Sequence, residues 1–294
     1  MNRDLKFYLS FFLSSLLIFH PSAPAEESHT LQIKGSDTMV NLGQAWAEEF
    51  MRVHPETSIA VTGGGSGTGI AAIIAGTCDI AQSSRDIKPE EKARAEARGK
   101  PIVETVAGYD GIAVIVNPDN PVSRLTRDQL ADIFTGKIRN WKEIGGADLP
   151  VLVLSRERNS GTHVFFLEHV LRRGNSRGTE EFADSVLMMP SSQAIVQEVE
   201  TSAAAIGYVG LGYVTEKQKV AAVGQTAAGP FVIPSLETVQ GGEYSISRPL
   251  YFLTRGEPAG TVKDFVDFVL SAEGQEIVRA LDFVPLKDQK VPGP

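Results

Sequence analysis

Hydrophobic residues in this chain follow two spacings, one typical of strands and one typical of helices. Residues 31–33 form a short strand pattern that ends at Lys34-Gly35. After Thr38, apolar residues recur mostly every three or four positions, as in an amphipathic helix, until His54-Pro55. The pattern predicts strands at 31–33, 58–62, 80–82, 111–116, 151–154, 206–209 and 249–254. It predicts helices at 38–53, 69–75, 89–98, 126–134, 161–172, 192–200, 261–270 and 272–281.

Strand patterns that alternate with helical patterns predict an α/β protein with parallel-dominated sheets. The run at 111–116 is continuously apolar, as in a strand covered on both faces. A similar run lies at 249–254, and we expect these two strands to cross between two lobes. The prediction is a discontinuous first lobe, residues 26–114 plus 247–294, and a continuous second lobe, residues 115–246.

The N-terminus has the features of a secretory signal peptide. Arg3 and Lys6 precede residues 7–19, which carry no charge, and Ala23-Pro24-Ala25 offers a small-x-small cleavage pattern. These thirteen uncharged residues are too few for a membrane span, which needs about 20. We therefore expect residues 1–25 to be removed after Ala25 and the mature protein to be periplasmic, without a lipid anchor, because no cysteine follows the apolar run.

Composition narrows the function classes. The chain is 42% hydrophobic and 22% charged, typical of a globular protein, and Cys78 is its single cysteine, which excludes an intrachain disulfide and a cysteine metal site. The formal net charge of −8 argues against nucleic acid or an anionic membrane as a partner. An anionic ligand would have to be attracted by local donors, since distant charges are screened beyond about 8–10 Å.

Three turns before predicted helices carry hydrogen-bond donors. They are Gly35-Ser36-Asp37-Thr38, the glycine-rich residues 63–69 around Ser66, and residues 155–162, which contain Arg156, Ser160, Gly161 and Thr162. Helix starts present unpaired backbone N–H groups and a positive dipole end, and hydroxyls and guanidinium groups add further donors. Together the three turns predict one oxyanion site.

Each turn also has a simpler interpretation. A glycine run is more often a flexible turn, although residues 63–69 match neither a Walker loop, nor a dinucleotide fingerprint, nor a nucleophile elbow. Ser36, Asp37 or Thr38 could only cap the following helix. Arg156 is harder to explain in this way, because a cation opposes the positive end of a helix and a guanidinium is suited to bind an anion with paired hydrogen bonds.

Several motifs resemble those of phosphate-specific substrate-binding proteins of Pst-type ABC importers. They are Gly-Ser-Asp-Thr at 35–38, Gly-Gly-Gly-Ser-Gly-Thr-Gly at 63–69, Ser-Ser-Arg at 83–85, Ile-Phe-Thr-Gly-Lys-Ile-Arg-Asn-Trp at 133–141, Arg-x-x-x-Ser-Gly-Thr at 156–162, Ala-Ile-Gly-Tyr at 205–208 and Ser-Ala-Glu-Gly-Gln at 271–275. The resemblance implies a two-lobed flytrap fold that closes on inorganic phosphate and delivers it to ABC permease membrane subunits. It implies a monomer with no enzymatic activity, cofactor, metal or nucleic-acid partner.

The resemblance also implies ligand-binding residues. Thr38 and the Met39 amide would hold one side of the phosphate and Ser66 another, with Ser36 a competing choice in the first turn. The Ser-Ser-Arg motif adds Ser84 and Arg85. The opposite lobe would contribute Arg156, Ser160, Gly161 and Thr162, and we expect Arg156→Ala to weaken binding far more than Arg172→Ala.

This chain departs from the family pattern at Ser84, where many members have an aspartate. The difference bears on selectivity between anions. Phosphate near neutral pH carries a proton that sulfate lacks, and a carboxylate that accepts its hydrogen bond repels sulfate. We expect Asp37 or Asp86 to take this role. The alternatives are a receptor for sulfate, molybdate or a phosphonate, and a phosphate-scavenging or signalling protein without a transporter. A third alternative is an enzyme in which Ser160 and His163 form a hydroxyl–imidazole nucleophile, but the sequence indicates no third group to orient the imidazole.

Overall fold

The computed structural model describes residues 30–175 and 177–287, so the predicted signal peptide lies outside the described residues. The strands are β1 (Leu31–Gly35), β2 (Ile59–Thr62), β3 (Ile80–Ser83), β4 (Ile102–Val116), β5 (Arg124–Thr126), β6 (Leu152–Arg156), β7 (Leu187–Met189), β8 (Ala205–Gly210), β9 (Lys219–Val220), β10 (Ala222–Gly224), β11 (Phe231–Val232) and β12 (Ser247–Arg255). The α-helices are α1 (Val40–Val53), α2 (Ser66–Ala75), α3 (Pro89–Glu96), α4 (Arg127–Phe134), α5 (Gly161–Phe166), α6 (Ser192–Thr201), α7 (Leu236–Gln240), α8 (Gly260–Leu270) and α9 (Ala272–Ala280). Shorter helical turns are η1 (Asp37–Met39), η2 (Trp141–Ile144), the π-helical η3 (Leu167–Leu171) and η4 (Leu211–Tyr213).

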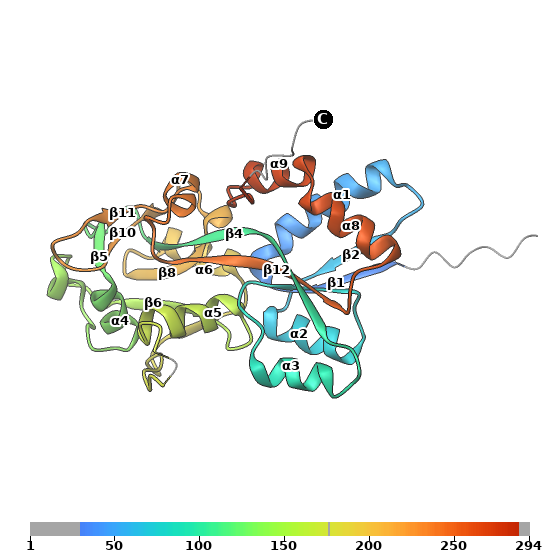
Figure 1. Cartoon of the computed structure of the whole chain (residues 1–294). Helices are drawn as coiled ribbons and strands as arrows, with labels where there is room; N and C mark the ends of the chain where they lie inside the picture. Colours follow the sequence, from blue (N-terminus) through green and yellow to red (C-terminus); the bar gives the residue numbers. More distant parts are fainter. Residues whose placement is uncertain (1–29, 176, 288–294) are drawn as a thin grey trace, which may run out of the picture.

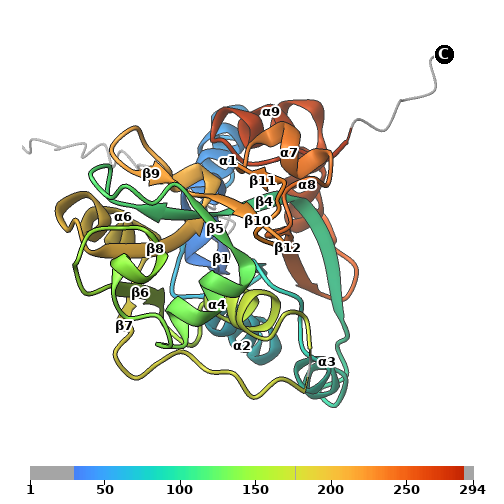
Figure 2. The ribbon, with the colours of Figure 1, turned by 90° about the vertical axis from the view of Figure 1, so that its left-hand side faces the viewer.

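One curled sheet runs through the described part of the molecule in the order β2-β1-β3-β12-β4-β8-β6-β7, with β9 also paired to β4. Pairing is parallel between β1 and its neighbours β2 and β3, and between β6 and its neighbours β7 and β8. The two central strands, β4 and β12, are antiparallel to each other over nine positions, from Gly111↔Ser247 to Ile102↔Arg255. A second, small sheet, β11-β10-β5, lies at the end of the molecule that faces the viewer in Figure 2.

The hydrophobic core is divided in two at β4 and β12. Buried residues from Ile112 to Ile246 form one cluster, joined by Val284, whereas Trp46, Phe252 and other residues before 108 and after 249 form a second. A smaller third cluster packs around α2 and α3 on the same side as the second. β4 therefore carries residues of both cores, and β12 enters the second core directly after Ile246 of the first. The molecule has two lobes joined by these two strands (Figure 1).

The expected α/β class and two-lobed architecture are confirmed, but several elements differ from the sequence prediction. The strand expected at 111–116 begins nine residues earlier, at Ile102, and pairs with antiparallel neighbours. Its first half escaped prediction because it mixes Glu104, Gly108 and Asp110 with apolar residues. The helix expected at 69–75 starts at Ser66, inside the glycine-rich turn. Within the described residues, none of the helices combines the length and hydrophobicity needed to cross a bilayer.

Candidate anion-binding site

Three serines from the first lobe meet at the point where β1, β3 and α2 converge. The Ser36 hydroxyl donates to Oγ of Ser84 over 2.8 Å, and the Ser84 N–H donates to Oγ of Ser66 over 3.0 Å. Ser36 follows β1, Ser84 follows β3, and Ser66 is the first residue of α2, so the parallel strands bring their following turns to one edge of the sheet. Each of these serines is at most 1% exposed.

The second lobe contacts this serine cluster through the start of α5. Oγ1 of Thr38 and Oγ1 of Thr162 are 2.8 Å apart. A Cβ atom added to Gly161 would lie 2.3 Å from Oγ of Ser66 and 2.6 Å from Oγ of Ser84, so only a glycine allows this approach. We refer to Ser36, Thr38, Ser66, Ser84 and Thr162 together as the hydroxyl cluster.

A buried ion pair from the two central strands lies beside the hydroxyl cluster. Nη2 of Arg248 is 2.9 Å from Oδ2 of Asp110, and both side chains are essentially inaccessible to solvent. The same Nη2 lies 3.0 Å from Oγ1 of Thr162 and 3.4 Å from Oγ1 of Thr38. Nη1 donates to the backbone carbonyl of Ser84 over 2.8 Å. Arg248 is therefore the guanidinium that contacts the cluster directly.

Burial sets the electrostatics of this pair. Loss of solvent raises the pKa of the Asp110 carboxyl above its ordinary value, although Arg248 and the N–H of Leu211 both act to lower it. Burial likewise lowers the pKa of the Arg248 guanidinium, and Asp110 counteracts this effect. The ion pair therefore places a buried carboxyl beside the cation that contacts the hydroxyl cluster.

Arg156, the arginine that the sequence nominates, contacts protein groups in this structure. Its Nη1 lies 2.9 Å from Oδ2 of Asp37, in the first lobe, and 3.0 Å from Oγ of Ser192. Its Nη2 and Nε donate to the carbonyls of Pro190 and Met189. The N–H of Ser192 also donates to Oδ2 of Asp37 over 2.9 Å. Arg156 and Asp37 thus form an ion pair between the lobes, with Arg156 only 2% exposed.

A second set of contacts joins the lobes next to this ion pair. The Asn159 side-chain amide donates to the carbonyl of Gly64 over 2.9 Å, and the N–H of Gly67 donates to the carbonyl of Asn159 over 2.9 Å. The glycine-rich turn is needed here, since a Cβ atom on Gly65 would lie 2.8 Å from the Asn159 carbonyl oxygen. These contacts fasten the turn before α2 to the turn before α5.

Ser160 and His163 have separate structural roles. The Ser160 hydroxyl caps α5 by accepting from the N–H groups of Thr162 and His163. The His163 ring stacks on Phe182, and its Nδ1 is 3.1 Å from Oγ of Ser155. Burial lowers the pKa of His163 to about 4, so the ring is neutral at physiological pH. Among the described residues, the Ser160 and His163 side chains form no hydrogen bond with each other.

Met39 and Arg85, which the resemblance also implies as ligand-binding residues, contact protein groups in this structure. The Met39 N–H donates to the carbonyl of Ser36 over 3.1 Å, and its side chain is buried. Arg85 points to α3, where both of its Nη atoms lie 2.8 Å from the carboxylate oxygens of Glu91. Asp86 is exposed and accepts from the hydroxyl of Tyr251. Neither Arg85 nor Asp86 therefore contacts the hydroxyl cluster, and Asp37 is engaged by Arg156.

The ion pair of Asp110 and Arg248 escaped the sequence analysis. A signal was available, because each of the two strands expected to cross between lobes is immediately preceded by a charged residue, one acidic and one basic. Antiparallel pairing places these residues directly opposite each other on one face. Charges at the ends of apolar strands are ordinarily exposed, so the signal was not distinctive.

Comparisons with known proteins show the family to which this chain belongs. A family model described as the PBP superfamily domain matches residues 20–273. The phosphate-binding protein PstS of Bacillus subtilis is 36% identical over 273 residues, which cover 92% of this chain and 86% of that protein. PstS of Pseudomonas aeruginosa is 32% identical, with coverage of 88% and 84%.

Solved structures give the same result. The substrate-binding protein of a phosphate ABC transporter from Clostridium perfringens, solved with bound phosphate, superposes with a TM-score of 0.79 at 35% identity and covers 88% of this chain and 100% of its own. An ABC-type phosphate transport receptor from Vibrio cholerae gives a TM-score of 0.69 at 29% identity, with coverage of 87% and 100%. The chain therefore belongs to the PBP superfamily and, within it, to the family of PstS phosphate-binding proteins.

Proposed function

We propose that this protein is an extracytoplasmic receptor that captures inorganic phosphate between its two lobes and delivers it to the membrane subunits of an ABC permease. The observation that carries the proposal is the buried hydroxyl cluster with Arg248 and Asp110 at the junction of the lobes. Several relatives of the chain are named as phosphate-binding proteins, which supports the same ligand.

Phosphate enters when the lobes are apart and replaces the contacts that the hydroxyls make with one another. Thr38 and Ser66 approach it from the first lobe, and Thr162 from the second, while Arg248 supplies the positive charge. Donors fixed in a water-excluded site bind an anion more strongly than the same donors in water. This local attraction outweighs the repulsion from a net charge of −8.

Asp110 makes the site selective for phosphate over sulfate. Its carboxylate, paired with Arg248, accepts the hydrogen bond of the phosphate proton, whereas fully ionised sulfate offers no such proton and meets an unfavourable negative charge. Asp110 therefore takes the role that the sequence analysis assigned to Asp37 or Asp86. Selectivity between these anions distinguishes the proposal from a sulfate or molybdate receptor.

The proposal also covers the export of the protein and the bounds of its two lobes. We propose that residues 1–25 are removed after Ala25 and that the mature protein works in the periplasm as a monomer. We place the lobes at residues 26–114 plus 247–294 and at residues 115–246. The hydrophobic clusters divide slightly earlier on β4, because Ile112, Ala113 and Val114 pack in the core of the second lobe. The engagement of Ser160 in capping and of His163 with Ser155 favours binding over catalysis.

Calorimetric titration with phosphate, sulfate and molybdate tests the function. The expected result is stoichiometric phosphate binding without turnover, with sulfate and molybdate at least about 100-fold weaker. Arg248→Gln should abolish phosphate binding at millimolar concentration, whereas Arg172→Gln, a change outside the cluster, should leave it unchanged. Tighter binding of sulfate or molybdate would overturn the choice of ligand, and equal effects of the two substitutions would overturn the site. Capture of permease subunits by the phosphate-loaded protein distinguishes an importer component from a scavenger.

A further inference from the structure

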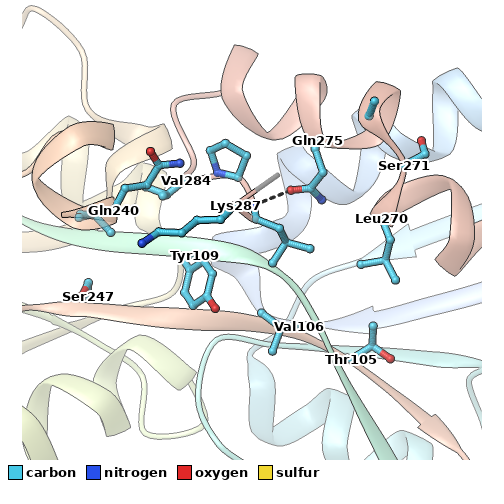
Figure 3. Close-up of a pocket in the computed structure, with 14 residues that line it drawn as sticks. Thr105, Val106, Tyr109, Gln240, Ser247, Leu270, Ser271, Gln275, Val284 and Lys287 are labelled. Carbon is cyan, nitrogen blue, oxygen red and sulfur yellow. Dashed lines mark hydrogen bonds between the residues drawn. The ribbon is translucent and has the colours of Figure 1, made fainter. Parts of the chain in front are cut away.

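A large cavity lies on the other face of the two central strands. It has a volume of about 1430 Å³. Tyr109 and Ser247 line it, whereas their chain neighbours Asp110 and Arg248 point to the hydroxyl cluster. Successive residues of a strand point to opposite faces. The same two strands therefore form the floor of this cavity, which Figure 3 shows. On their other face they form one wall of the anion site.

The walls of the cavity come from both lobes. Val239 and Gln240 of α7 line one side, and Val239 belongs to the core of the second lobe. Leu270, at the end of α8, and Gln275 of α9 line the other side, next to the core of the first lobe. Figure 1 shows α7 and α9 on one side of the central strands, and α2 and α5 on the opposite side. Any rotation of one lobe against the other therefore changes the width of the cavity.

The direction of this change follows from the contacts across the anion site. In this structure Thr38 and Thr162 touch, so the lobes are closed on that face. If the lobes separate there by pivoting on β4 and β12, the opposite face must close, and α7 must approach α8 and α9. The cavity is therefore wider in the phosphate-binding, closed state than in the open state.

The lining chemistry indicates the kind of ligand. Of the described residues around the cavity none is acidic, and the apolar ones include Val106, Leu270 and Val284. Lys287 is exposed, and it makes no ion pair with another described residue. The Lys287 side chain extends along the cavity in Figure 3. Gln275 is already engaged, donating to the carbonyls of Ala107 and Val269 and accepting from the N–H of Leu286.

From these observations we propose that the cavity is an allosteric site for an amphipathic organic monoanion, with an aromatic or aliphatic body on the apolar lining and its acid group on Lys287. Because the occupied cavity favours the closed lobes, such a ligand increases phosphate affinity, and phosphate increases its affinity by the same factor. The binding itself is independent of the proposed function, and only the coupling rests on it.

The test uses 8-anilinonaphthalene-1-sulfonate as the anionic probe and N-phenyl-1-naphthylamine as its uncharged counterpart. Fluorescence titration of phosphate-free protein should give saturable binding of the sulfonate. Lys287→Gln should weaken it at least about fivefold, while Lys100→Gln, at an exposed lysine away from the cavity, should not. Leu270→Glu, at a partly exposed rim position, should weaken it further through repulsion. Saturating phosphate should strengthen sulfonate binding at least about fivefold.

Several outcomes would overturn the proposal. Sulfonate binding that is unchanged by both Lys287→Gln and Leu270→Glu would place the probe elsewhere, and equal binding of the uncharged probe would remove the acid group from the argument. Weaker sulfonate binding in phosphate would reverse the sign of the coupling. If calorimetry detects phosphate binding while the probe behaves in one of these ways, only this inference fails. If phosphate does not bind, the proposed function fails. The effect of Lys287→Gln on sulfonate binding then still tests whether the cavity binds the probe.

Discussion

At the scale of single residues, Asp110 is placed to decide which anion the protein accepts. Its carboxyl group forms an ion pair with Arg248 and accepts a hydrogen bond from the Leu211 N–H, and burial raises its pKa. We expect Asp110→Asn to weaken phosphate binding at least about tenfold, because the proton acceptor loses its charge. Sulfate binding should strengthen, because Arg248 then faces the anion without a neighbouring negative charge. Calorimetry with both anions measures the change in their affinity ratio.

Asp86→Asn is the matched control for this prediction, since Asp86 is exposed and bonded to Tyr251. It should leave both affinities unchanged. Thermal unfolding without ligand separates loss of binding from loss of fold. If Asp110→Asn still excluded sulfate while Asp37→Asn admitted it, the selectivity would belong to the carboxylate that the sequence analysis first proposed.

His163 is predicted to make the fold sensitive to acid. Burial lowers its pKa from about 6.5 in the unfolded chain to about 4 in the folded protein. Between these values the unfolded state binds more protons, so the free energy of unfolding decreases as the pH falls from 6.5 to 4. The loss is at most about 3 kcal/mol. Denaturant unfolding at pH 7 and pH 4.5 should show a smaller difference for His163→Gln than for the unmodified protein.

His54→Gln serves as the comparison for this measurement, because its ring is half-exposed near Glu56. It should preserve the acid sensitivity of the parent. An unchanged pH dependence in His163→Gln would assign the effect to another group, such as the Glu91 carboxyl: although burial acts to raise its pKa, Arg85 and the Lys88 N–H lower it.

At the scale of elements, the start of α5 depends on a glycine for its close approach to α2. A methyl group at Gly161 would lie 2.3 Å from Oγ of Ser66, although alanine is otherwise a better helix former than glycine. We expect Gly161→Ala to keep or slightly raise the thermal stability of the ligand-free protein and to weaken phosphate binding at least about tenfold. Differential scanning calorimetry and phosphate titration of the same sample measure both effects. Normal affinity would mean that the lobes need not approach this closely.

Much of this element structure could be predicted from the sequence, and the failures have local causes. The helix α1 was predicted because its apolar residues Leu42, Trp46 and Phe50 recur at helical spacing and form its buried face. The start of α2 is harder to predict, since Ser66-Gly67-Thr68 has low helix propensity. In the structure the N–H of Gly67, in the first turn of α2, donates to the carbonyl of Asn159, a contact that the sequence does not show. The short strands β9, β10 and β11 have two or three residues each, too few for a period to be recognised.

The site was predicted in part for similar reasons. Hydroxyl-bearing turns are visible as local motifs, so Ser36, Thr38, Ser66 and Thr162 could be nominated without a structure. Arg248 and Asp110 are 138 positions apart, and only the antiparallel pairing of β4 with β12 brings them together. Conversely, Arg156 was nominated from its motif, but a sequence does not show that Asp37 of the other lobe lies within reach.

At the scale of the whole molecule, contacts between protein groups hold the lobes together on the side of the anion site. The ion pair of Arg156 with Asp37 and the hydrogen bond from Asn159 to Gly64 both join the two lobes. Contacts that exist only in the closed state shift the equilibrium towards it, and a ligand that requires closure then binds more tightly. Phosphate affinity should therefore depend on residues that do not touch phosphate.

A double-mutant cycle on Asp37 and Arg156 tests this dependence. If their ion pair acts as a latch, Asp37→Asn and Arg156→Gln should each weaken phosphate binding by roughly three- to tenfold, and the double variant should be little worse than either. Small-angle scattering without phosphate should show a smaller closed fraction in each variant than in the parent protein. If Arg156 instead binds phosphate, as its motif implies, Arg156→Gln alone should cause a much larger loss. Asp37→Asn should then leave affinity unchanged or raise it, because the guanidinium would be released from its carboxylate partner and become free to turn towards the anion.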